Sequence, residues 1–184
     1  MTHLAQAKDL ATLLDRPESD PRLELALRRA SDAFVGAVGH PVVRAEGSRL
    51  LRCDGGPELQ LPARPVHEAT VALAVSEPIS LTPGAAGPII LDGHLGILTR
   101  PQGWPRGAMA HVTWNAGYDP DEIPGDIQDV VLERAAHIAE NLGIYRQESV
   151  GSTSATFDPA AAGGATQRWV DVVDRYRVGV GEWS

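Results

Sequence analysis

The stretch that decides the fold runs from Trp104 to Gly143 and reads WPRGAMAHVTWNAGYDPDEIPGDIQDVVLERAAHIAENLG. Its first part alternates between two kinds of side chain over residues 108–114, which predicts a β-strand. Prolines at positions 120 and 124 disfavour helix in the residues before them, and Pro124 can occupy the first turn of a helix. Apolar side chains then recur every three or four residues as far as Leu142, and Gly143 supplies a stop. The stretch therefore predicts a strand, an acidic elbow and a long core helix.

Acidic side chains approach this helix and continue along it: Asp119, Asp121, Asp126, Asp129 and Glu133. Carboxylates near a helix N-terminus are stabilised by the helix dipole, by about 0.3–1 kcal/mol each. A cation site is the other interpretation, although the spacing fits no calcium-binding loop. Neither interpretation identifies a substrate.

Two more amphipathic helices are expected upstream, over residues 4–14 and from Pro21 to Val38. From about residue 42 to residue 115, short alternating runs predict a small antiparallel sheet, with hairpin turns at 54–56 and 92–93. Helices with one apolar face must pack on each other. We therefore expect a mainly helical α+β fold, a bundle of three to four helices with an inserted sheet.

The composition changes after residue 145. Residues 1–145 are expected to form the core, and residues 146–184 an extended C-terminal arm that contains a short helix capped by Thr166. This arm carries Trp169 and Tyr176 with little of its own to bury them against. It either docks on a partner or folds back on its own domain.

Charge and length limit the function classes. The chain has 184 residues and a net charge of −8, and residues 118–184 carry 12 acidic but only 5 basic side chains. Such a chain is poorly suited to gripping nucleic acid through its phosphates, which needs clustered cations. The single cysteine, Cys53, excludes an intramolecular disulfide. No apolar run approaches the roughly 20 residues that span a bilayer, and the N-terminus lacks the layout of a signal peptide. We expect a soluble protein that does not interact with membranes.

Catalytic motifs are not found. The six histidines are scattered singly, Cys53 is better explained as a small apolar strand residue than as a nucleophile, and the only lysine, Lys8, lies in no phosphate-binding loop. The alternative to a structural protein is a small cytoplasmic metal-assisted hydrolase, in which His94, His111 and Asp119 would each lie about 2.0–2.2 Å from one ion. We expect no enzyme and no cofactor.

Four segments carry a resemblance to a known family: LPARPV at 61–66, WPRG at 104–107, VTWNAGY at 112–118 and ESVGS at 148–152. Together with the order of helices and strands, they span nearly the whole chain. The chain resembles the head–tail adaptor (head-completion, connector) proteins of long-tailed double-stranded-DNA phages, notably those that infect actinobacteria.

The resemblance implies a structural virion protein of the head–tail neck, assembled in the host cytoplasm. It implies a closed ring of about twelve copies beneath the portal protein, which extends the DNA channel toward a tail-side connector (stopper) or tail terminator. DNA would pass through the lumen without sequence recognition. The acidic residues named above would face either the lumen or a neighbouring subunit. The arm would dock on the portal by strand addition and aromatic anchors, through Val150, Ser152, Thr153, Ala155, Phe157, Trp169 and Tyr176.

Overall fold

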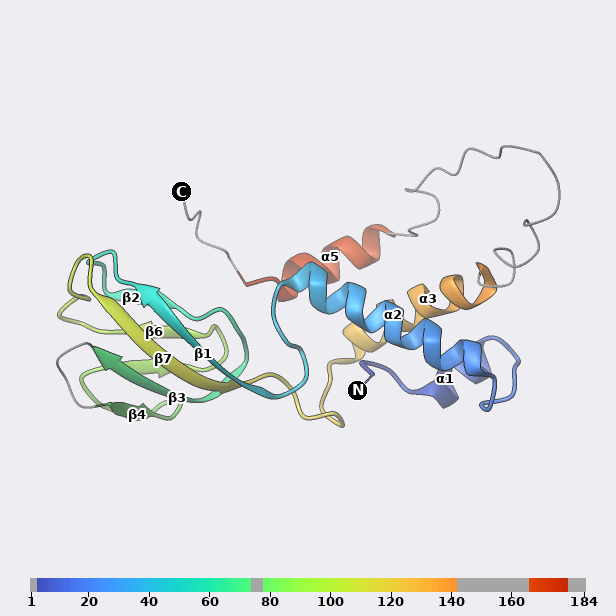
Figure 1. Ribbon diagram of the computed structural model, residues 1–184, viewed down its shortest axis with the longest axis horizontal. Helices are drawn as coiled ribbons and strands as arrows, with labels where there is room; N and C mark the ends of the chain where they lie inside the picture. The colour runs from blue at the N-terminus through green and yellow to red at the C-terminus, as the bar shows by residue number, and fades with distance from the viewer. Residues whose placement is uncertain (1–2, 74–77, 142–165, 179–184) are drawn as a thin grey trace. The chain divides into compact units, whose positions relative to one another are not determined.

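The computed structural model describes residues 3–73, 78–141 and 166–178 (Figure 1). The chain divides into two compact units. The helical unit comprises residues 1–38 and 123–177, and the β unit comprises residues 39–122 and 178–184. The β unit is therefore inserted in sequence between two helices of the other unit.

The first two helices of the helical unit are α1 (Ala7–Leu13) and α2 (Pro21–Val38). Helix α2 begins at a proline, and the Asp20 carboxylate accepts a hydrogen bond from the backbone N–H of Arg22 at 3.0 Å. The carboxylate thereby satisfies one of the backbone N–H groups left free in the first turn of the helix. The expected apolar stripe is confirmed as the buried face of α2, formed by Leu23, Leu27, Ala30, Phe34 and Val38.

Helix α3 (Gly125–Asn141) is the long helix predicted after Pro124. Its first turn is fixed by the Gln128 side-chain amide, which donates to the carbonyl of Ile123 at 2.7 Å. Its buried face packs against α2 and consists of Ile127, Val130, Val131, Ala135 and Ala139. The fourth described helix, α5 (Gln167–Tyr176), contacts both α2 and α3 (Figure 1).

The β unit contains two antiparallel sheets where a single small sheet was expected. The larger has the order β1 (Ala45–Arg52), β7 (Met109–Ala116), β3 (Val66–Leu73), β4 (Ile79–Leu81). The smaller has the order β2 (Glu58–Gln60), β6 (Ile97–Thr99), β5 (Ile90–Asp92). Buried side chains from all seven strands form one apolar cluster, so the two sheets share a core.

One predicted hairpin is confirmed and the other is wrong. Strands β5 and β6 pair as the turn at 92–93 predicts, and the Asp92 carboxylate accepts from the Leu95 N–H at 2.9 Å. Residues 54–56 do form a turn, in which the Asp54 carboxylate accepts from the Gly56 N–H at 2.7 Å. However, β1 pairs with β7 and β2 pairs with β6. The turn carries the chain from one sheet to the other. Which strands pair depends on residues far apart in the sequence, and the turn residues do not determine it.

The described residues thus contain four helices and seven strands, a mixed α+β fold rather than the mainly helical one expected. Helix α5 belongs to the helical unit, whereas the sequence analysis placed it in a separate arm. The reason is its apolar stripe, which packs against α2 and α3. None of the described helices is long and apolar enough to cross a membrane.

Candidate interaction surface

Helix α5 closes the helical unit. The Thr166 hydroxyl caps it by accepting a hydrogen bond from the Trp169 N–H at 3.2 Å. Three of its side chains, Trp169, Val172 and Val173, are buried. A ten-residue helix is marginal alone, so its stability comes from packing this one face.

Trp169 is the anchor of this contact. Its ring meets Phe34 of α2 edge to face, with 5.4 Å between centroids and an angle of 88° between planes. The Arg134 guanidinium of α3 lies 4.6 Å from the centre of the indole ring, in cation–π geometry. Burial lowers the pKa of Arg134 from its ordinary value, because the charged form loses hydration there. Trp169 is only 7 % exposed, so it is not the exposed anchor that the sequence predicts.

Ion pairs join the outer side of α5 to α3. Arg168 bridges Asp129, at 2.7 Å, and Glu133. Arg175 pairs with Asp126 at 2.6 Å, and the Tyr176 hydroxyl donates to the same carboxylate at 2.9 Å.

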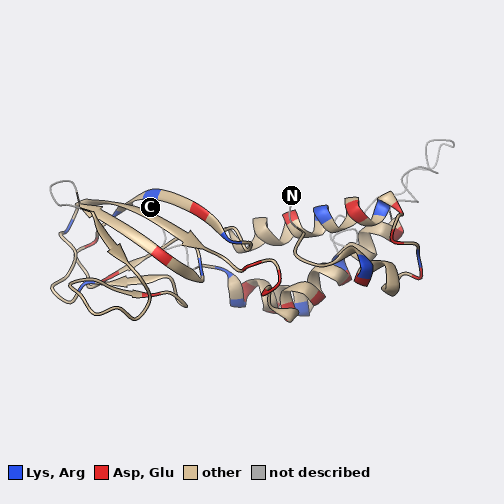
Figure 2. Ribbon diagram, turned by 90° about the horizontal axis from the view of Figure 1, so that it is seen from below, with Lys and Arg blue, Asp and Glu red and all other residues tan. Residues whose placement is uncertain are grey.

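The acidic residues of α3 therefore have partners on α5 of the same chain. The hydrogen bond to Asp129 and the charge of Glu133 raise the pKa of Arg168 above its ordinary value. Exposed pairs of this kind contribute little to the free energy of unfolding. Figure 2 shows that acidic and basic residues both occur on the helices. Three of the five predicted acidic residues are thus engaged by helix α5 of the same chain.

The other two acidic residues lie in the β unit, so the five do not form one continuous acidic face. Asp119 pairs with Arg44 at 3.1 Å, and Arg44 also contacts the Nε2 atom of His67 at 3.0 Å. Asp121 is exposed in the loop that follows. The elbow that looks continuous in sequence crosses the boundary between the units at residues 122–123.

A pocket of about 250 Å³ lies beside Trp169, between α3 and the start of α5. The Nε2 atom of His137 is buried and has no hydrogen-bond partner among the described residues. This pocket was not predicted from the sequence. The only local signal is the three-residue spacing of Arg134 and His137, which places both on one face of the helix. The lining residues are Val130, Glu133, Arg134, His137, Thr166 and Trp169.

Two of the residues that line the pocket, His137 and Thr166, come before and after residues 142–165 in the sequence. His137 lies one turn before the end of α3, and Thr166 directly precedes α5. The remaining predicted docking residues, Val150, Ser152, Thr153, Ala155 and Phe157, lie in that segment and outside the described residues.

The hydrolase alternative finds no metal site. Across residues 3–73, 78–141 and 166–178, no group of three or more His, Cys, Asp or Glu side chains is placed to hold a metal ion. His94, His111 and Asp119 are thus not brought together. Cys53 is 1 % exposed, and burial raises the pKa of its thiol, which keeps it protonated at neutral pH. This agrees with its interpretation as a small apolar residue.

Comparison with known proteins finds similarity in structure but not in sequence. No protein-family model and no curated protein sequence matches the chain. Among solved structures, the chain is similar to a chain in the neck of a native gene transfer agent (GTA) particle, computed with C12 symmetry. The TM-score is 0.54 and the sequence identity is 18 %. The match covers 94 % of this chain and 87 % of the GTA chain. A chain of the native GTA virion matches with a TM-score of 0.54 and 18 % identity, covering 95 % and 90 %.

A third match, in the neck of an empty GTA particle with C6 symmetry, has a TM-score of 0.54 and 16 % identity and covers 95 % and 90 %. At these identities the likeness shows a shared fold. It covers residues of both units.

Proposed function

We propose that this protein is a structural component of the neck of a phage-like particle, where it forms the ring adaptor between the portal vertex and the tail. The observation that carries the proposal is the match of fold along 94–95 % of the chain to chains from particle necks and virions. The family resemblance of the four sequence segments supports the same role independently. No enzymatic activity is proposed.

The physical character of the chain suits a DNA conduit. Its net charge of −8 leaves it without the clustered cations that would hold phosphates and slow DNA passage. The proposed ring extends the channel, and double-stranded DNA passes through it without sequence recognition. The exposed residues Asp121 and Glu122 are available to face a lumen or a neighbouring copy, whereas Asp126, Asp129 and Glu133 are held by α5.

Docking on the portal is assigned to the residues from Val150 to Phe157. Trp169 and Tyr176 have a supporting role, since they hold α5 against α2 and α3. The tail-side connector or terminator is proposed to meet another part of the ring.

Co-purification with the portal protein of the same particle tests this assignment. Truncation after Tyr145 would also remove α5 and uncover Phe34, so it cannot separate docking from stability. The informative variant is Val150→Asp with Phe157→Asp, compared with Ser149→Asp with Gln147→Asp, which adds the same charge outside the named docking residues. We expect the first variant to lose portal binding while the second retains it. Equal binding by both variants would remove the docking role from these residues.

A further inference from the structure

The four-stranded sheet has an outer face that no described element covers within the β unit. Its register defines this face, because side chains directly opposite each other on paired strands point to the same side. Leu50, His111 and Ala72 form one row across β1, β7 and β3. The next rows are Ser48, Thr113 and Thr70, and then Glu46, Asn115 and Glu68. The alternate residues of β7, Ala110 and Val112, point into the core.

One end of this outer face is apolar. Leu50 is 58 % exposed and Met109 is 43 % exposed, and both lie next to His111. Large apolar side chains with this much solvent exposure usually occur singly on the surface of a soluble protein. Here two are diagonal neighbours on the same face of paired strands, which is typical of a protein–protein contact.

The other end of the face is an acidic groove of about 570 Å³ that crosses the three strands. Glu46 and Glu68 stand on either side of Asn115. The side-chain oxygen of Asn115 is buried and accepts no hydrogen bond within the described residues. The groove therefore contains three hydrogen-bond acceptors, of which the carboxylates of Glu46 and Glu68 are charged. A positively charged hydrogen-bond donor would complement them. An arginine satisfies this requirement, because its planar guanidinium presents several donors to carboxylates.

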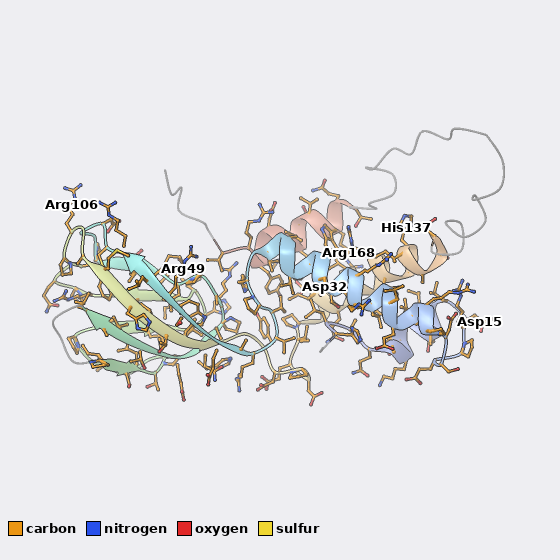
Figure 3. The ribbon with its side chains drawn as sticks, viewed as in Figure 1. Asp15, Asp32, Arg49, Arg106, His137 and Arg168 are labelled. Carbon is orange, nitrogen blue, oxygen red and sulfur yellow. The ribbon has the colours of Figure 1, made fainter. Side chains whose placement is uncertain are left out.

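The β unit itself presents such an arginine at its opposite end. Arg106 is exposed in the loop between β6 and β7 (Figure 3) and makes no ion pair within the described residues. The loop is held rigidly beneath it by Trp104, which is 2 % exposed and whose indole N–H donates to the Pro57 carbonyl at 3.1 Å. The backbone N–H of Gly107 also donates to the Cys53 carbonyl at 2.8 Å. A loop backbone that is already ordered loses little freedom when it binds.

We propose that the outer face of the four-stranded sheet binds the loop of residues 100–107 of a second copy, with Arg106 seated between Glu46 and Glu68. The inference rests on the proposed ring, for which it names the contact between copies. The two surfaces are different and lie at opposite ends of one compact unit, so the contact is heterologous and repeats with a rotation until the ring closes. Leu50 and Met109 supply the apolar part of the contact.

Charge exchange in the full-length protein tests the proposal, with native mass spectrometry as the readout and thermal unfolding as the folding control. Arg106→Glu, and separately Glu46→Arg with Glu68→Arg, should raise the concentration needed for half-assembly by about tenfold or more, because like charges replace the attraction. The triple variant should assemble again. Leu50→Asp should weaken assembly without lowering the unfolding temperature.

Matched controls carry the same charge changes elsewhere. Arg49→Glu alters a neighbouring exposed arginine whose side chain is on the other side of β1, opposite Val112. Glu18→Arg with Glu24→Arg changes two exposed acids of the helical unit. Both controls should assemble like the unaltered protein.

The outcomes separate this inference from the proposed function. Rings that persist in the charge variants, or that fail to return in the triple variant, would overturn the inference and leave the adaptor role intact. Unchanged mass with a lower unfolding temperature would assign the face to a contact inside one chain and would also overturn it. An unaltered protein that stays monomeric with the portal present would overturn both.

Discussion

Trp169 shows at the scale of one residue how the C-terminal helix is held. The indole ring fills the space beside Phe34 and carries the Arg134 guanidinium on its face. Trp169→Ala should lower the free energy of unfolding of the helical unit by about 3–5 kcal/mol, the usual cost of emptying a buried aromatic site. Val170→Ala, at a position 39 % exposed on the same helix, should change it by less than about 0.5 kcal/mol. Denaturant titration measures both, and equal effects would contradict the anchoring role.

Gly47 is a residue of the β unit whose packing can be tested in the same way as that of Trp169. A Cβ atom at this position would lie 2.6 Å from the ring of Trp114, its partner on β7, because the indole lies over the glycine. Gly47→Ala should therefore destabilise the β unit by about 1–3 kcal/mol.

Gly36 is the matched control for Gly47. It lies in α2, where an added Cβ would meet nothing within 4 Å. Gly36→Ala should stabilise its helix by about 0.5–1 kcal/mol, since alanine restricts the unfolded chain. Thermal unfolding should show shifts of opposite sign, and two shifts of the same sign would contradict the packing described.

At the scale of elements, α5 combines two kinds of contact that respond differently to salt. Raising the ionic strength from about 0.1 M to about 1 M shortens the Debye length from about 10 Å to about 3 Å and screens the exposed pairs of Arg168 and Arg175. The packing of Trp169, Val172 and Val173 is not screened. Amide hydrogen exchange should show α5 slightly less protected at high salt and unprotected in Trp169→Ala at any salt. Complete loss of protection by salt alone would mean that the ion pairs hold the helix.

The elements show which parts of the fold were predictable from sequence. The bounds of α2 and the start of α3 follow from local signals, namely capping by Asp20, the prolines at 21 and 124, and apolar periodicity. The pairing of β1 with β7 joins residues more than fifty positions apart. The turn at 54–56 gave no information about that choice, since the same Asx turn serves a hairpin or a crossover between sheets.

The candidate surface was predictable only in part for the same reason. Thr166 and the apolar stripe of α5 predicted the helix correctly. Its docking on Phe34 depends on residues more than 130 positions upstream, and the pairing of the acidic residues of α3 with Arg168 and Arg175 is equally non-local. The groove on the outer sheet face appears only when the registers of β1, β7 and β3 are known.

At the scale of the whole molecule, the division into two units makes a prediction about folding. The apolar cluster of the β unit draws all its residues from positions 51–116, so it needs no side chain of the helical unit. Residues 40–122 expressed alone should therefore fold with dispersed amide proton resonances and a cooperative unfolding transition. Collapsed, broad resonances would show that the β unit depends on the helices.

The adaptor role is tested most directly by electron microscopy of the full-length protein mixed with the portal protein of its particle. We expect a closed ring of this protein that sits coaxially on the portal and leaves a central channel open, because its fold is like that of chains from particle necks with C12 and C6 symmetry. A monomer that leaves the portal bare would contradict the central claim.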